Sequence, residues 1–139
     1  PGRPPLVANG DVTDAATARD ALAASGADAV MVGRGAQGAP WRLAQIAHDL
    51  CGTPAPVVPY GPALADAVAT HYDDILSLYG RDLGLRVARK HLGWYADANR
   101  ADAAGRAALM RAPDTGAALA LIRSVFADAA GDPAARVAA

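Results

Sequence analysis

The sequence contains few cysteine and aromatic side chains, and this shortage excludes several protein classes. Cys51 is the one cysteine among 139 residues, so the chain cannot form an internal disulfide, and a reducing, cytoplasmic setting is expected. Aromatic residues make up 5% of the chain, although 53% of its residues are hydrophobic. Much of that hydrophobic content is alanine, which favours helices but buries little area. We therefore expect a globular, predominantly helical protein with a thin core.

A long apolar run, a strong net charge and a metal-binding pattern are also missing. No apolar stretch reaches the length of a membrane span, and no signal peptide is visible. His48, His71 and His91 lie too far apart in sequence to indicate a metal site. The formal net charge is −1, so any nucleic-acid-binding surface must be a local patch. We expect neither a membrane nor a metal among the partners.

Two short apolar runs near the start of the chain predict two strands. Residues Leu6–Ala8 and Ala29–Val32 are apolar without alternation, as in strands that are covered on both faces. Residues 14–25 between them have a helical pattern that Thr13 or Asp14 can cap and that ends at Gly26. A strand, a helix and a strand of this length predict a βαβ unit with parallel strands.

Each predicted strand ends in a glycine-containing turn, first Asn9-Gly10-Asp11 and then Gly33-Arg34-Gly35. The carboxyl ends of parallel strands share one edge, where sites are usually built. Glycines allow the backbone to approach a phosphate, N–H groups at the following helix N-terminus face it, and an arginine adds a bidentate cation. Either turn alone is more often an ordinary loop. Their equivalent positions, one repeat apart as in an (α/β)8 barrel, favour phosphate binding.

The proline-rich residues 52–62 predict a stiff, extended linker, because proline disfavours helix. This places an α/β part in residues 1–51, an all-helical part in residues 63–131 and a frayed tail in residues 132–139. Four helical patterns follow the linker, and the expected caps of the last three are Asp82, Asp102 and either Asp114 or Thr115. We expect the helices to span about residues 62–79, 82–98, 102–111 and 115–131. Short loops between them predict a small four-helix bundle.

Residues 85–97 have a helical pattern with a basic side. Arg86, Arg89 and Lys90 are three or four positions apart, so their side chains cluster. Gly93 leaves a gap on this side, where a backbone could approach closely. Tyr95 lies on the opposite, apolar stripe and is expected in the core. Most such charge clusters are solvated helix faces, and composition alone favours that interpretation over a polyanion-binding surface.

Taken together, these motifs resemble bacterial tRNA-dihydrouridine synthases over most of residues 6–126. The matching stretches are Asn9-Gly10-Asp11, Gly26-Ala27-Asp28, Gly33-Arg34, Gln37-Gly38-Ala39-Pro40-Trp41, Tyr79-Gly80, Gly84-x-Arg86, Ala88-Arg89-Lys90-His91 and Trp94-Tyr95. The resemblance implies the last two βα units of an FMN-binding (α/β)8 TIM barrel, followed by a helical tRNA-binding domain. It also implies a flavoprotein oxidoreductase that reduces uridine in tRNA to dihydrouridine, with NADPH as the expected reductant.

The resemblance assigns roles to particular residues of this chain. The expected FMN-phosphate ligands are Asn9, Gly10, Asp11, Gly33 and Arg34. The expected tRNA contacts are Arg86, Arg89, Lys90 and Trp94, whereas His91 is expected to be a hydrogen-bonded structural residue.

No catalytic residue is expected within this chain. In the family, the acid is a cysteine on a loop of an earlier barrel strand, and Cys51 matches no catalytic position. Two strands cannot close a barrel, so the remainder of a barrel upstream of Pro1 is an expected partner, and the chain alone is expected to be inactive. Two alternatives stay open: a piece of another FMN-dependent TIM-barrel oxidoreductase, such as a dihydroorotate-dehydrogenase-like enzyme, and a non-catalytic RNA-binding helical domain.

Overall fold

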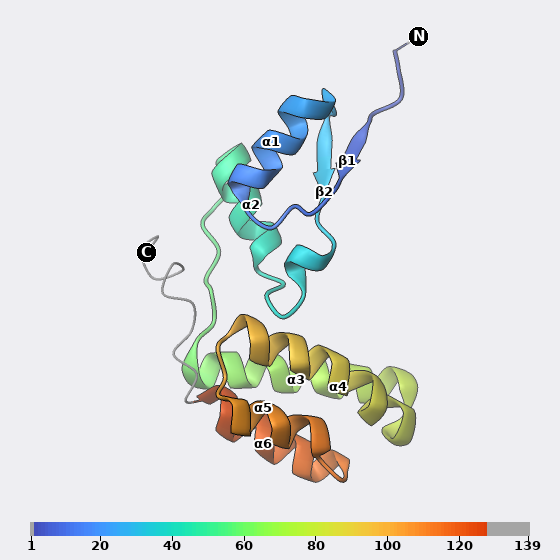
Figure 1. Cartoon of the computed structure of the whole chain (residues 1–139), viewed down its shortest axis with the longest axis vertical. Helices are drawn as coiled ribbons and strands as arrows, with labels where there is room; N and C mark the ends of the chain where they lie inside the picture. The colour runs from blue at the N-terminus through green and yellow to red at the C-terminus, as the bar shows by residue number, and fades with distance from the viewer. Residues whose placement is uncertain (1, 128–139) are drawn as a thin grey trace. The chain divides into compact units, whose positions relative to one another are not determined.

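The computed structural model describes residues 2–127. The chain divides into two compact units, Pro1–Val57 and Val58–Ala139. This division falls within the proline-rich segment, where residues 52–60 form neither helix nor strand. Figure 1 shows the order of the elements along the chain.

The first unit is built on a parallel pair of strands. β1 (Val7–Asn9) and β2 (Ala29–Met31) form a two-stranded parallel sheet in which Asn9 is paired with Met31. The sequence predicts this parallel pairing correctly. Both bounds differ slightly from expectation, because β1 begins one residue later and includes Asn9, and β2 ends one residue earlier.

Helix α1 (Ala15–Ser25) connects the strands and packs against both of them. It begins at Asp14, whose carboxylate accepts a hydrogen bond from the Thr17 N–H at 2.8 Å. It ends at Gly26, which adopts a left-handed conformation with φ 62°. The core of this unit consists of Val12, Ala18 and Ile46, with Ala21, Val30, Val32 and Leu50 packed around them.

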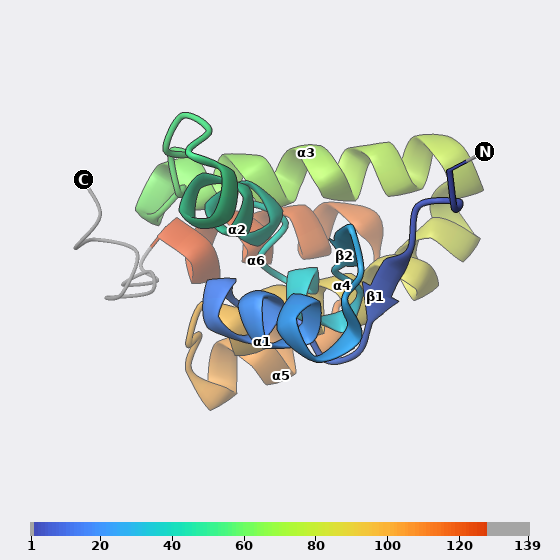
Figure 2. The same ribbon diagram turned by 90° about the horizontal axis from the view of Figure 1, so that it is seen from above.

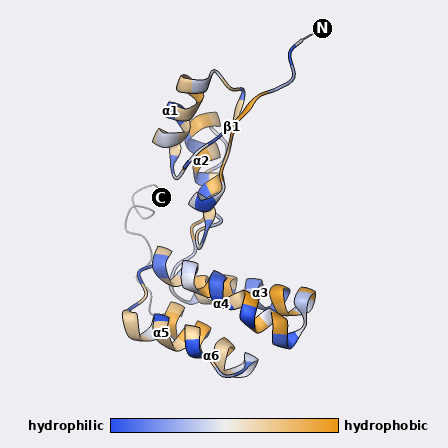
Figure 3. Cartoon of the chain, turned by 45° about the vertical axis from the view of Figure 1, so that its right-hand side comes forward, coloured by the Kyte–Doolittle hydropathy of each residue, from blue (hydrophilic) through white to orange (hydrophobic). Residues whose placement is uncertain are grey.

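The sheet is covered less completely than the apolar sequence of its strands predicts. Leu6, Val7 and Met31 are 51%, 57% and 51% exposed, and β1 is coloured as hydrophobic in Figure 3. Among the described residues, α1 is the one helix that packs against the strands. The expectation that both faces are covered therefore fails within this unit.

A short 3-10 helix, η1 (Arg34–Ala36), follows β2 and leads to α2 (Arg42–Cys51). Trp41 is the N-cap of α2. It packs against α1 and η1. Gly52, with φ 67°, ends it.

The second unit is all-helical, since its described residues contain four helices and no strand. It consists of α3 (Gly61–Tyr79), α4 (Arg81–Ala98), α5 (Ala103–Arg111) and α6 (Thr115–Ala127). α3 packs against α4 and α6, and α5 packs against the same two helices, as Figures 1 and 2 show. The largest fully buried side chains of this unit are Leu64, Val68, Tyr72, Leu92, Leu109, Ile122 and Phe126.

Of the three helix caps predicted for the second unit, two are confirmed and one is wrong. Asp102 accepts a hydrogen bond from the Gly105 N–H at 2.5 Å, and Asp114 accepts one from the Ala117 N–H at 2.8 Å. Asp82, however, lies inside the first turn of α4, and Gly80 is the N-cap. The reason is that Gly80, with φ 75°, ends α3 and begins α4 at a single residue. The predicted end of the last helix at Gly131 and the tail lie outside the described residues.

Within residues 2–127, no helix is both long enough and apolar enough to cross a bilayer.

Candidate functional site

The loops that follow β1 and β2 meet at the same edge of the sheet. Asn9 is the last residue of β1, and its partner Met31 precedes Gly33 by two positions. Across the edge, the Arg34 guanidinium donates to the Asp11 carboxylate in an ion pair whose side chains are 78% and 79% exposed. The structure therefore brings together the two turns that the sequence singles out, and it leaves Asn9, Gly10, Asp11, Gly33 and Arg34 exposed.

Gly35 holds these two loops in close contact. A Cβ atom at this position would lie 2.2 Å from the Val12 carbonyl oxygen and 3.1 Å from the Thr13 Cα. Any side chain would therefore force the loops apart, so glycine is required for this approach. The sequence places Gly35 in the second turn but does not predict its contact with Val12.

The start of α1 is not open to an anion, contrary to expectation. Its Thr17 N–H is bound by the Asp14 carboxylate, and the Thr17 hydroxyl accepts hydrogen bonds from the N–H groups of Thr13 and Asp14 at 3.0 and 3.1 Å. The hydrogen bond from the Thr17 N–H lowers the pKa of Asp14, so a negative charge already occupies this helix end. The loop after β2 differs from the start of α1, because Gly33 begins η1 without a side-chain cap. Backbone N–H groups of this loop are therefore better candidates for binding an anion.

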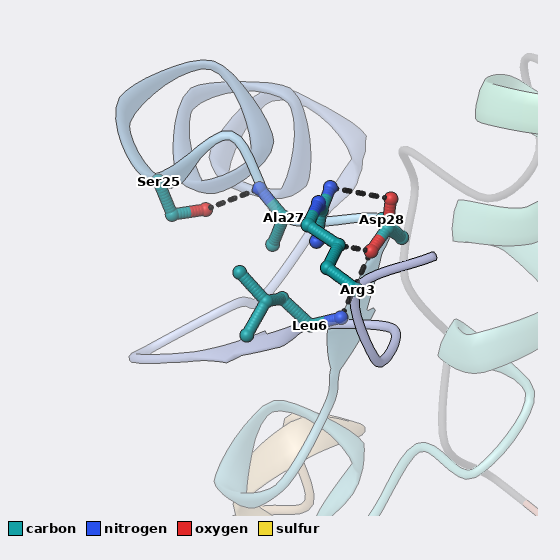
Figure 4. A network of polar contacts seen from close by, with 5 residues as sticks. All are labelled: Arg3, Leu6, Ser25, Ala27 and Asp28. Atoms are coloured by element: carbon teal, nitrogen blue, oxygen red, sulfur yellow. Dashed lines mark hydrogen bonds and ion pairs between the residues drawn. The ribbon is translucent and has the colours of Figure 1, made fainter. Parts of the chain in front are cut away.

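Asp28, part of the Gly26-Ala27-Asp28 motif, serves the fold at the opposite ends of the strands. Its carboxylate accepts hydrogen bonds from Arg3 Nη1 and Nη2 at 2.8 and 2.9 Å and from the Leu6 N–H at 2.8 Å (Figure 4). These contacts tie the segment before β1 to the start of β2. This motif residue therefore does not belong to the strand-end site.

On the second unit, α4 presents part of the predicted basic side to solvent. Arg86 and Lys90 are exposed, and Trp94 is half-buried. The Lys90 ammonium lies over the Trp94 ring, 4.9 Å from its centroid, which is a cation–π geometry. A base that stacks on this face of Trp94 would have to displace Lys90.

Arg89 and Gly93 are placed differently from the rest of the basic side. Arg89 is half-buried, its Nη2 donates to the Ala112 carbonyl at 3.1 Å, and its Nε is a buried donor with no hydrogen-bond partner among the described residues. Gly93 is buried, and Arg106 and Met110 of α5 lie 3.7 Å from the position of a Cβ atom. The expected gap at Gly93 is therefore filled by side chains, because α5 covers this side of α4.

A row of rings joins α4 to α3. The His91 ring contacts the rings of Trp94 and His71 edge-on, with centroid distances of 5.0 and 5.1 Å. His71 Nδ1 shares a hydrogen bond of 3.0 Å with the hydroxyl of Tyr95, which is buried as predicted. Burial lowers the pKa of His91, and the neighbouring His71 and Lys90 lower it further.

His91 is expected to be hydrogen-bonded, but the contacts described for its ring are edge-on packing against His71 and Trp94. The sequence does not predict the contacts of His71 with His91 and Tyr95, because these two residues lie on another helix. Within residues 2–127, no group of three or more His, Cys, Asp and Glu side chains is arranged to hold a metal ion.

The chain belongs to the dihydrouridine synthase family, since residues 3–130 match the family model described as "Dihydrouridine synthase (Dus)". This match confirms the family that the motifs indicate. A "Probable tRNA-dihydrouridine synthase" of Rhodobacter capsulatus is 65% identical over 124 residues, which cover 89% of this chain and 38% of the relative.

Two further relatives carry similar names. A "Probable tRNA-dihydrouridine synthase" of Rickettsia conorii is 45% identical over 78% of this chain and 34% of its own length. A "tRNA-dihydrouridine synthase B" of Xanthomonas axonopodis pv. citri is 42% identical over 88% of this chain and 37% of its own length. The chain thus spans less than two fifths of the length of these relatives.

Proposed function

We propose that this chain forms the FMN-phosphate-binding and tRNA-binding portion of a tRNA-dihydrouridine synthase. Such an enzyme is a flavin-dependent oxidoreductase that reduces uridine in tRNA to 5,6-dihydrouridine, with NADPH as the reductant. The observation that carries the proposal is the meeting of two strand-end loops, joined through Gly35 and the Asp11–Arg34 pair. The family match and the names of the relatives support the reaction.

In this proposal, the first unit supplies the last two βα units of an (α/β)8 TIM barrel. The exposed apolar side chains of Leu6, Val7 and Met31 support it, since further strands and helices would cover them. Cys51 is exposed at the end of α2, and we assign it no role. The chain alone is expected to be inactive.

Arg34 is the central phosphate ligand in this proposal. Its guanidinium carries five N–H donors, so it can hold Asp11 and a phosphate at the same time. Asp11 then fixes the orientation of the cation. Backbone N–H groups of Gly10, Asp11 and Gly33 and the amide of Asn9 would complete the cradle. FMN supplies hydride chemistry when it is bound.

The flavin proposal is tested by the replacement Arg34→Gln in the full-length synthase. The loss of a charge-assisted hydrogen bond, about 1.5–3 kcal/mol, should weaken FMN binding roughly 10- to 150-fold, as measured by flavin fluorescence on dilution. Arg19→Gln removes the same charge from α1, where Arg19 donates to the Asp49 carbonyl, and should leave FMN affinity unchanged. Equal FMN affinity of all three proteins would exclude Arg34 as a phosphate ligand and, with it, the proposed cradle.

The second unit is proposed to bind the tRNA backbone through Arg86 and Lys90, with Trp94 beside them. Arg89 is a weaker candidate, because part of its guanidinium is bound to the Ala112 carbonyl. These side chains lie on one helix and would recognise the shape and charge of the RNA rather than its sequence.

The tRNA proposal is tested by measuring affinity against salt concentration for an Arg86→Gln/Lys90→Gln variant. Each lost phosphate contact should reduce the salt slope by nearly one unit, so a decrease of about two is expected. The matched control is Arg111→Gln/Arg123→Gln, which removes two exposed charges from α5 and α6. If both variants change the slope equally, the α4 surface is only a solvated helix face.

A further inference from the structure

Arg106 of α5 extends the basic surface of α4. Its Nε and Nη2 donate to the two carboxylate oxygens of Asp97 at 2.6 and 3.1 Å. The Nη2 atom also lies 3.7 Å from the place where Gly93 would carry a Cβ atom. The guanidinium of Arg106 therefore occupies the stretch of the α4 surface between Gly93 and Asp97.

This stretch continues the line of Arg86 and Lys90. Positions 86, 90, 93 and 97 are spaced by four, three and four residues, so they lie on one side of the helix in successive turns. Since one turn rises about 5.4 Å, Arg86, Lys90 and Arg106 form a row of three cations. Gly93 contributes the space, and the third charge comes from α5.

The pairing with Asp97 also orients Arg106. A carboxylate bound to Nε and Nη2 leaves the N–H groups of Nη1 directed away from Asp97, and the Arg106 and Asp97 side chains are 45% and 56% exposed. Arg106 stands in the first turn of α5, where the helix dipole disfavours a cation. Helix stability therefore does not explain an arginine at this position.

We infer that Arg106 is a third contact to the RNA backbone and that Asp97, although negatively charged, strengthens RNA binding by holding Arg106 in place. The inference rests on the proposed binding of tRNA by Arg86 and Lys90. It makes Asp97 a positioning residue. Removal of the Asp97 carboxylate should therefore weaken RNA binding, whereas simple charge repulsion between Asp97 and a polyanion would make the same variant bind more tightly.

The experiment measures tRNA affinity of the full chain between 50 and 200 mM salt. Arg106→Gln should make the loss of affinity over this range about threefold smaller, as expected for one phosphate contact fewer. Asp97→Ala should also weaken binding, despite the removal of a negative charge. Asp74→Ala removes an exposed carboxylate from α3, and it should leave binding unchanged or slightly tighter.

A double variant, Asp97→Ala/Arg106→Gln, should bind like Arg106→Gln alone, since Asp97 acts through Arg106. Tighter binding by Asp97→Ala would overturn the positioning role. If Arg106→Gln lowers the melting temperature but keeps the salt slope, the pair only ties α5 to α4, and the inference is wrong. If Arg86→Gln/Lys90→Gln is also without effect, the proposed RNA surface itself is wrong.

Discussion

The two buried glycines of α4 should respond in opposite ways to replacement by alanine. A Cβ atom at Gly84 would lie 2.8 Å from Leu76 Cδ2, 3.0 Å from Leu76 Cα and 3.3 Å from the Ile75 carbonyl oxygen. A Cβ atom at Gly93 would have its nearest neighbours, Arg106 and Met110, at 3.7 Å. The first site is closed by the backbone of α3, whereas the second accepts a methyl group in ordinary van der Waals contact.

The magnitudes follow from two opposing free energies. Alanine is favoured over glycine in a helix interior by up to about 1 kcal/mol, and this gain applies to both sites. Overpacking costs about 1–3 kcal/mol, and it applies to Gly84 alone, because the Leu76 Cα cannot rotate away. Gly93→Ala should therefore stabilise the helical unit, and Gly84→Ala should be less stable than Gly93→Ala by about 1–3 kcal/mol. A difference of 1 kcal/mol shifts the melting temperature by about 4–8 °C in a unit of this size.

The measurement is thermal and urea unfolding of the full chain, followed by tryptophan fluorescence. Trp41 lies in the first unit and Trp94 in the second, so a Trp41→Phe background makes the signal report on the helical unit. If Gly84→Ala is as stable as Gly93→Ala, the backbone of α3 does not restrict the space at Gly84, and the prediction is wrong. Gly93→Ala should also keep the salt dependence of tRNA binding, since it leaves Arg106 in place.

Three further predictions concern single side chains. Asp14→Ala should lower the free energy of unfolding of the first unit by about 0.5–2 kcal/mol, as measured in urea titrations. The folded pKa of Asp14 is lowered, so the stabilisation by its carboxylate should disappear as the pH falls below 3.8, the ordinary pKa of this group. The folded pKa of His91 is also lowered, so the unfolded chain takes up a proton on this ring before the folded chain does. The free energy of unfolding of the helical unit should therefore fall as the pH drops below 6.5. His91→Gln should flatten this pH dependence, and an unchanged pH profile in the variant would contradict the prediction. Gly35→Ala should weaken FMN binding to the full-length synthase, because it separates the two strand-end loops. Gly2→Ala, which has open space around its Cβ position and lies before β1, should leave FMN binding unchanged.

Features that depend on neighbours in sequence were predictable from the sequence. Asp14, Asp102 and Asp114 cap their helices through N–H groups three residues further on, and Gly26 ends α1 through its own backbone conformation. The parallel strand pair follows in the same way, from the length of the connection between two apolar runs. Each of these features is decided within a short segment, so the pattern of that segment is sufficient.

Features that depend on the number of neighbouring helices were not predictable in the same way. A helical wheel divides α4 into one apolar and one polar side, but α4 packs against α3, α5 and α6. Three neighbours narrow the exposed side, and the residues at its border, Arg89 and Gly93, become partly or fully buried. For a related reason, the sequence does not predict the roles of His71 and Arg106. Each of these side chains contacts residues of α4 but belongs to a different helix.

The motif residues can now be separated by what the fold requires of them. Asp28 binds the segment before β1, Gly84 permits the contact of α4 with α3, and Arg89 binds the turn between α5 and α6. Packing and hydrogen bonding account for these residues without a ligand. Arg86 and Lys90 are motif residues as well, yet they are exposed, and the folded unit would lose little without their charges. A motif residue that the fold does not need is the best candidate for a ligand contact. The exposed side of α4 is therefore a better candidate than the motif as a whole.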